Sequence, residues 1–150
     1  MQLAGKHIFD APPSVLWKML MDTEILAKVV PGISKLERID DNSFKAIVEI
    51  KLGPVSGSFT GNLQMEDIEE PKGFTLKVQQ NSKIGNANAA IKIALTPVTE
   101  NQTEVAFDGD VKLSGLLATM GNRVVGGVSN TLTKQFFANL EKELAAQSVQ

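Results

Sequence analysis

The chain has 150 residues, which is enough for one domain that buries a substantial apolar core. Its 15 basic and 17 acidic side chains give a formal net charge of −2, so it lacks the basic field that binds nucleic acid through phosphates. Cysteine and tyrosine are absent and His7 is the single histidine, which excludes disulfides and thiolate catalysis and leaves few groups for acid–base chemistry.

The N-terminal part of the chain predicts a strand followed by two short helices. The strand covers Gln2–Phe9 and ends before two consecutive prolines, which cannot donate to a strand ladder. Residues 14–21 place apolar side chains on one helical face, which favours a first helix. Asp22 can cap a second helix over Thr23–Val29, and the Pro-Gly pair that follows would end it.

Six further strands are expected between the second helix and residue 113. Apolar and polar side chains alternate along them with a period of two, which is typical of an antiparallel sheet with one face in water. Turn-forming Gly, Pro, Asn and Asp residues separate them. The predicted strands cover residues 33–39, 44–52, 59–65, 74–78, 87–95 and 105–113.

The last predicted element is one uninterrupted helix from about residue 116 to residue 145, with apolar side chains at steps of three and four. A long helix that follows antiparallel strands can bury its apolar face only if the sheet curls around it. The predicted fold class is therefore α+β. A curved antiparallel seven-stranded sheet wraps around a long C-terminal helix, two short helices follow the first strand, and residues 1–150 form a single domain.

The side chains expected to face into the curved sheet are almost all apolar, and we predict that they line a ligand-binding cavity beside the first half of the terminal helix. Small residues on the same faces should leave space; these are Ala46, Gly61, Ala87, Ala89 and Gly109. Any single lining residue could instead serve as ordinary core packing. The predicted lining consists of Phe44, Val48, Ile50, Phe59, Leu63, Leu76, Ala89, Ile91, Ile93, Phe107, Val111, Leu117, Met120 and Val124.

Three further features allow two interpretations each. Arg123 is either a solvated side chain or a polar handle for the ligand at the mouth of the cavity. Gly121, Gly126 and Gly127, in the first half of the terminal helix, indicate either close packing on the sheet or a loosened segment that admits ligand. His7 has no partner motif, so we expect a surface or structural residue and no catalytic residue. No residues have metal-ligand spacing, and no metal or cofactor is expected.

Short motifs distributed along nearly the whole chain resemble those of one known family. In order, they are Leu3-Ala4-Gly5, Ala11-Pro12 with Val15-Leu16-Trp17, Asp22-Thr23-Glu24, Val30-Pro31-Gly32, Gly53-Pro54-Val55 with Phe59-Thr60-Gly61, Gly85-Asn86-Ala87, Ser114-Gly115-Leu116-Leu117-Ala118, Gly121-Asn122-Arg123 and Gln135-Phe136-Phe137. With these motifs the chain resembles the CoxG family of carbon monoxide dehydrogenase subunits, within the START-like (SRPBCC) helix-grip superfamily. The family often has proline where this chain has Thr23, and the C-terminal extension of longer members is not part of this sequence.

The resemblance implies an accessory protein of a carbon monoxide dehydrogenase-type molybdenum hydroxylase, because family members are encoded beside such enzymes. It implies non-catalytic binding of a lipophilic small molecule, such as a respiratory quinone or a lipid, which the protein would carry to or from the enzyme at the membrane. Two alternatives stay open. One is a structural or maturation accessory that binds no ligand, and the other is a START-like enzyme that uses the cavity, although the predicted lining offers no acid–base group.

Residues 1–10 lack an apolar signal core, and no apolar run approaches the roughly 20 residues of a membrane span. We therefore expect a location in the cytoplasm, or at the inner face of the membrane as a peripheral protein.

Overall fold

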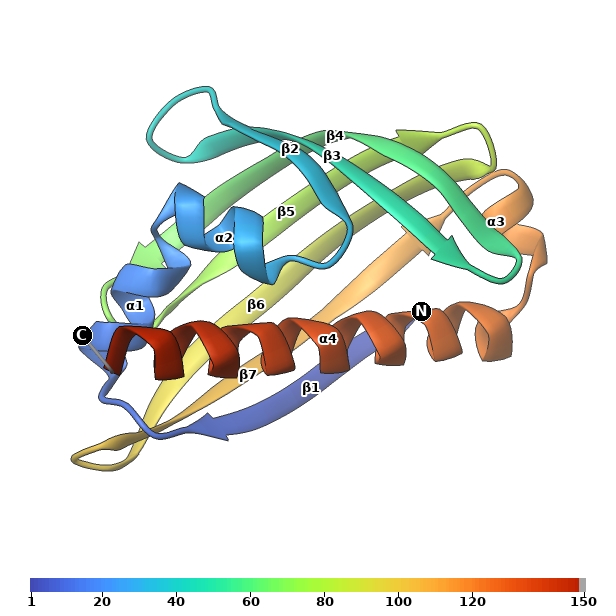
Figure 1. The fold of residues 1–150 in the computed structure, drawn as a ribbon. Coiled ribbons are helices and arrows are strands. Elements are labelled where there is room, and N and C mark those ends of the chain that lie inside the picture. Colours follow the sequence, from blue (N-terminus) through green and yellow to red (C-terminus); the bar gives the residue numbers. More distant parts are fainter. Residues whose placement is uncertain (149–150) are drawn as a thin grey trace.

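One sheet of seven antiparallel strands curves around a long helix in this computed structural model, which describes residues 1–148 (Figure 1). In space the strands follow the order β1-β7-β6-β5-β4-β3-β2, so the first and second strands of the chain form the two edges. Along the chain the elements are β1 (Gln2–Phe9), α1 (Pro13–Leu20), α2 (Thr23–Val29), β2 (Ile33–Arg38), β3 (Ser43–Leu52), β4 (Val55–Glu69), β5 (Gly73–Ser82), β6 (Gly85–Thr99), β7 (Gln102–Leu113), α3 (Leu116–Thr119) and α4 (Asn122–Ser148).

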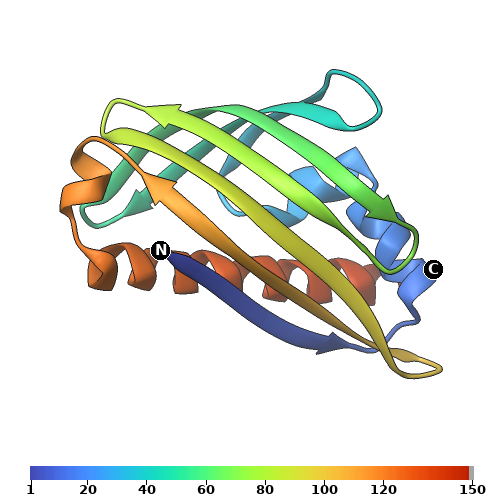
Figure 2. The same cartoon turned by 180° about the vertical axis from the view of Figure 1, so that it is seen from behind.

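Helix α4 lies across the concave face of the sheet, and α1 and α2 lie beside its C-terminal half (Figure 1). From the opposite side, the strands stand in front of the helices (Figure 2). The Asn139 side-chain amide donates to the Val29 carbonyl at 3.2 Å, which holds α4 against α2. This arrangement confirms the predicted fold class, including the seven-stranded sheet and the two short helices after β1.

The prediction of one uninterrupted terminal helix is wrong, because the chain breaks between α3 and α4. Gly121 occupies this break with a φ of +85°, a backbone conformation that other residues adopt only with strain. The Gly121 carbonyl then accepts from the Val125 amide at 3.2 Å, as α4 begins. The break lets α3 fold against the β5–β6 turn, where the Leu117 amide donates to the Ile84 carbonyl at 2.9 Å. No helix among the described residues has the length and apolar character that a bilayer crossing requires.

The closely packed core occupies only one end of the molecule. There α1, α2 and the C-terminal half of α4 meet the sheet, and side chains such as Phe9, Leu16 and Leu140 are fully buried. At the other end the buried apolar cluster is small and consists of Val55, Phe59 and Leu117, with partly buried neighbours. The two short helices therefore fill one end of the concave face, and the first half of α4 covers the other with little beneath it.

Most of the small residues expected to leave space for a cavity have a different structural role. A Cβ atom on Gly61 would meet the Gln79 carbonyl, and one on Gly109 would meet the Ala90 carbonyl. These glycines therefore permit neighbouring strands to approach closely where the sheet bends. Ala46 is fully buried and lines neither of the two apolar cavities described below. The expectation that these three residues open a cavity is wrong.

The glycines in the first half of α4 have open space around them. A Cβ atom added to Gly126 or Gly127 would have no heavy atom within 4 Å, apart from those of the adjoining helix backbone. Close packing on the sheet therefore does not explain them, and that alternative is wrong. Each of the two glycines lowers the stability of the helix by roughly 1 kcal/mol relative to alanine at the same position.

We expect the combined substitution Gly126→Ala and Gly127→Ala to raise the free energy of unfolding by about 0.5–1 kcal/mol per site, because alanine restricts the unfolded chain and fits the helix. Urea denaturation followed by circular dichroism measures this change. The matched control is Gly121→Ala, which should destabilise the protein because its left-handed backbone costs a non-glycine residue about 1–2 kcal/mol. A double variant less stable than wild type would contradict the interpretation of open space.

Candidate functional site

An apolar cavity of about 320 Å³ lies between the middle of α4 and the concave face of the sheet. We call it the first chamber. Strands β3, β5, β6 and β7, helices α1 and α4 and the loop after α2 contribute to its wall, with Leu3 from the edge strand β1. Its other lining residues are Leu20, Val30, Pro31, Val48, Leu76, Ile91, Ile93, Val105, Phe107, Ser129, Leu132, Thr133, Phe136 and Phe137.

A second cavity of about 200 Å³, the second chamber, lies under the first half of α4. It is lined by Met1, Val48, Ile50, Val55, Phe59, Gln80, Ala87, Val111, Leu113, Leu117, Val125, Val128, Ser129 and Leu132. Val48, Ser129 and Leu132 belong to both linings, so the two chambers adjoin at these side chains. Small-molecule pockets have volumes of roughly 300–1,000 Å³, and the first chamber alone falls within this range.

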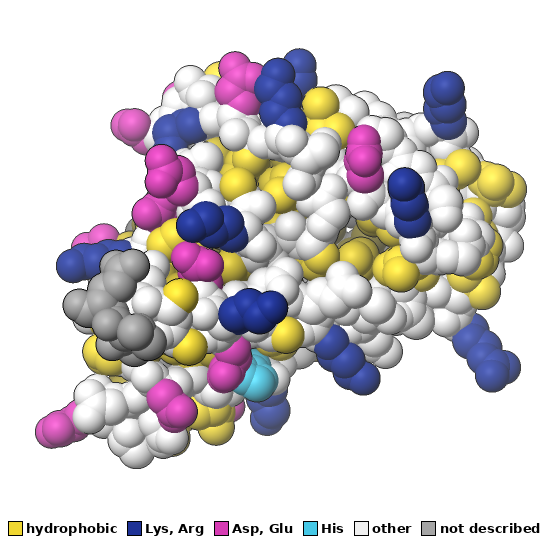
Figure 3. Space-filling view, viewed as in Figure 1, with side chains coloured by type: hydrophobic (Ala, Val, Ile, Leu, Met, Phe, Trp, Pro, Cys, Tyr) yellow, Lys and Arg dark blue, Asp and Glu magenta, His cyan; other side chains and the backbone are white. Residues whose placement is uncertain are grey.

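The surface opens toward this site along α4. Figure 3 shows apolar side chains in the hollow between α4 and the strands above it. Soluble domains rarely leave contiguous apolar surface open to water unless something binds there. The hollow gives an apolar molecule a route to the chambers.

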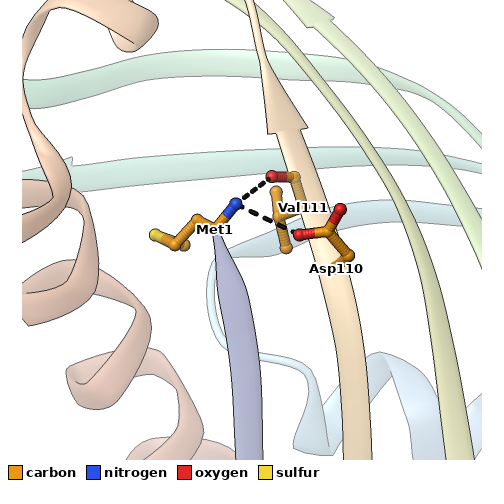
Figure 4. A network of polar contacts seen from close by, with 3 residues as sticks. All are labelled: Met1, Asp110 and Val111. Carbon is orange, nitrogen blue, oxygen red and sulfur yellow. Dashed lines mark hydrogen bonds and ion pairs between the residues drawn. The ribbon is translucent and has the colours of Figure 1, made fainter.

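Met1 closes the second chamber near the edge of the sheet (Figure 4). Its terminal ammonium group lies 3.1 Å from Oδ1 of Asp110 and donates to the Val111 carbonyl at 3.0 Å. These contacts fix the residue, and its side chain extends toward α4 (Figure 4). Asp110 is exposed on the outer side of β7, so its carboxylate does not enter the chamber.

Among the residues that the structure describes, those that line the two chambers include no ionisable side chain. Their polar side chains are Gln80, Ser129 and Thr133. Hydroxyl groups on a helix can bond to the carbonyl four residues earlier, so Ser129 and Thr133 have a local alternative to a ligand. Such a surface suits an apolar molecule with few polar atoms and provides no side-chain acid or base for catalysis.

In the second chamber, the polar side chain of Gln80 lacks a local hydrogen-bond partner of this kind. It lies on β5 with an exposed fraction of 7%, and neither Nε2 nor Oε1 has a hydrogen-bond partner among the described residues. An unpaired buried polar group costs about 1–3 kcal/mol. This residue was missed from the sequence, although Gln80 continues the inward alternation of Phe74, Leu76 and Val78 along β5.

The structure brings most of the predicted lining residues together around the chambers. Those in the wall of one or both are Val48, Ile50, Phe59, Leu76, Ile91, Ile93, Phe107, Val111 and Leu117. They come from five different strands and from α3, as the predicted curvature of the sheet requires. Their role in ligand binding stays a prediction.

The other predicted lining residues do not border either chamber. Phe44 is fully buried in the closely packed core, and Leu63 packs against the same cluster. Met120 packs beside Leu117 in the smaller cluster. Ala89 lies in neither wall. Val124 is 37% exposed, because a helical turn takes about 3.6 residues, so repeated steps of four drift away from the buried face, and Val125 lies inward in its place.

Arg123 and His7 both lie at the surface. Arg123 is exposed and borders neither chamber, so its proposed role as a polar handle finds no support in its position. His7 has a partner that the sequence did not reveal: its Nε2 lies 2.9 Å from Oε1 of Glu141. The imidazole also stacks on Phe137 with ring centroids 5.4 Å apart. His7 therefore links β1 to α4 on the outside of the molecule.

Among residues 1–148, no group of three or more His, Asp or Glu side chains is arranged to hold a metal ion.

Comparison with known proteins identifies relatives over almost the whole chain. The family of carbon monoxide dehydrogenase subunits described as CoxG matches residues 5–145. A conserved protein from Geobacillus kaustophilus is 29% identical, with a TM-score of 0.93 over 97% of this chain and 96% of that one. No curated protein sequence matches the chain.

More distant structures share the fold alone. A START superfamily protein from Mycobacterium smegmatis is 15% identical, with a TM-score of 0.76 over 97% of this chain and 98% of that one. The Zhui aromatase/cyclase from Streptomyces sp. R1128 is 11% identical, with a TM-score of 0.75 over 100% of this chain and 96% of that one.

We expect Val128→Phe to fill part of the second chamber and to lower the affinity for the neutral apolar probe N-phenyl-1-naphthylamine about fivefold or more, because the added ring occupies space that the probe needs. Probe fluorescence during titration measures this affinity. The matched control is Val124→Phe, one helical turn earlier on the exposed side of α4, which should bind like wild type. Equal effects of the two variants would place the probe outside the second chamber.

Proposed function

The chain belongs to the CoxG family of carbon monoxide dehydrogenase subunits, and on this premise we propose that it binds a lipophilic small molecule in the two chambers and releases it unchanged. The molecule would be a respiratory quinone or a lipid. The protein would act as an accessory of a carbon monoxide dehydrogenase-type molybdenum hydroxylase, in the cytoplasm or as a peripheral protein at the inner face of the membrane.

The observation that carries this proposal is the character of the chamber walls. Apolar side chains from β1 and from β3 to β7 converge on α4, and no ionisable side chain interrupts them. Burial of apolar ligand surface there contributes roughly 25 cal/mol per Å² to binding, before the costs of association. A molecule with a long hydrocarbon portion gains most from such a site.

The apolar walls of the adjoining chambers support a respiratory quinone as the ligand. It combines a flexible apolar tail with a compact head that carries two carbonyl oxygens. A protein that shields such a molecule from water can move it between a membrane and an oxidoreductase, and its affinity must then differ between the free and partner-bound states. The first half of α4, where Gly126 and Gly127 have open space around them, is the segment that we expect to move during exchange.

The two alternatives explain the structure less well. A purely structural accessory would be expected to fill the concave face with its own side chains, as the opposite end of the molecule does. An enzyme that uses the chambers needs convergent acid–base groups, and the walls supply none from ionisable side chains. His7 does not change this, because it lies outside the chambers and is bonded to Glu141.

The proposal is tested by whether the protein purified from cells carries a bound molecule. Purified without detergent and examined by native mass spectrometry, the protein should carry an added mass of a neutral lipophilic molecule that organic solvent extracts. Val128→Phe should show a lower occupied fraction than Val124→Phe, since only the former side chain borders a chamber. A bare chain mass in wild type, with no uptake of added quinone, would contradict the proposal.

A further inference from the structure

Gln80 presents an unsatisfied amide to the second chamber. Its side chain is more than nine-tenths buried, and both polar atoms lack partners among the described residues. Across the sheet its neighbours are Gly61 on β4 and Ala87 on β6, and neither side chain can accept or donate a hydrogen bond. The other side chains of the wall are apolar apart from Ser129.

A buried polar side chain in such surroundings is unfavourable for the empty protein. A leucine of similar length would fill the same space without that cost. The buried amide is therefore better explained by a hydrogen bond to a bound ligand than by a contribution to folding stability. Natural sequences depart from the usual packing of buried side chains most often at functional sites.

We propose that Gln80 determines ligand specificity by hydrogen bonding to an oxygen atom on the headgroup of the lipophilic ligand. The headgroup then lies in the second chamber and the apolar tail extends past Val48, Ser129 and Leu132 into the first chamber. This inference rests on the proposed function, because it requires that the chambers take a lipophilic molecule.

The chemistry of the amide defines the class of headgroup. A glutamine side chain has two N–H donors at Nε2 and an acceptor at Oε1. Nε2 can donate to a carbonyl oxygen of the ligand, and Oε1 can accept from a hydroxyl group. A ligand that alternates between carbonyl and hydroxyl forms would therefore retain a partner in both forms.

Two variants and two probes separate this role from simple packing. The probes are decylubiquinone, which has a carbonyl-bearing head and a ten-carbon tail, and decylbenzene, which has the same tail on a hydrocarbon ring. Gln80→Leu removes the amide. The control Gln79→Leu makes the same change one residue earlier, on the exposed outer face of β5. Affinities come from displacement of N-phenyl-1-naphthylamine, calibrated for each variant.

Gln80→Leu should weaken decylubiquinone binding about tenfold, which corresponds to one lost hydrogen bond in an apolar site, and should leave decylbenzene binding within about twofold of wild type. Its melting temperature should rise, because an unpaired buried amide is gone. Gln79→Leu should leave both affinities unchanged.

An equal effect on both probes, unchanged decylubiquinone affinity or a lower melting temperature would overturn the role of Gln80 and leave the proposed function standing. Failure of wild type to bind either probe would overturn both.

Discussion

A single helix cannot fill the concave face of a curved seven-stranded sheet. An α-helix with its side chains is about 10–12 Å wide, whereas the sheet curls over the whole length of α4 (Figure 1). At one end α1 and α2 fill the remaining volume, and the core there is closely packed. Beneath the middle and the first half of α4, the helices α1 and α3 and the loop after α2 contribute only to the walls of the remaining space, and the two chambers lie there.

Three locally unfavourable features accompany these chambers. Gly126 and Gly127 weaken the first half of α4 without any packing requirement. Gln80 is buried without a partner among the described residues. The chambers themselves forgo the dispersion contacts that a filled core would make. Natural sequences usually depart from local consistency where function requires it, and here the departures gather around one site.

The sequence predicted the sheet well because alternation with a period of two reports directly which face of a strand is buried. Phe59, Ile91 and Val111 could be assigned to the concave face on that basis alone. The same pattern could not separate a residue in a chamber wall from one in a filled core. Phe44 and Phe59 both face inward, yet only Phe59 borders a chamber, because the placement of α1 and α2 decides which end is filled.

The errors on the terminal helix have a different origin. Apolar residues continue through the break at Gly121, so their spacing did not reveal it. A helical turn takes about 3.6 residues, so the series of four-residue steps from Leu140 back to Val124 drifts away from the buried face. Val124 was therefore expected in the cavity, whereas Val125 occupies that position. Gln80 was missed because a polar residue in the alternating pattern of a strand usually marks the place where the buried face ends.

The helix-grip fold by itself does not distinguish a carrier from an enzyme, so the choice between these two functions rests on the residues of the chamber walls.

The central claim is that a lipophilic molecule occupies the space between α4 and the concave face of the sheet. Methyl-resolved NMR of the protein titrated with decylubiquinone tests it most directly. Methyl signals of Val128, Leu132 and Ile91 should shift, since these side chains border the chambers. Signals of the exposed Ile39 and Val98 should stay in place. Shifts confined to exposed methyl groups, with the signals of the chamber walls unchanged, would show that the ligand does not occupy this space.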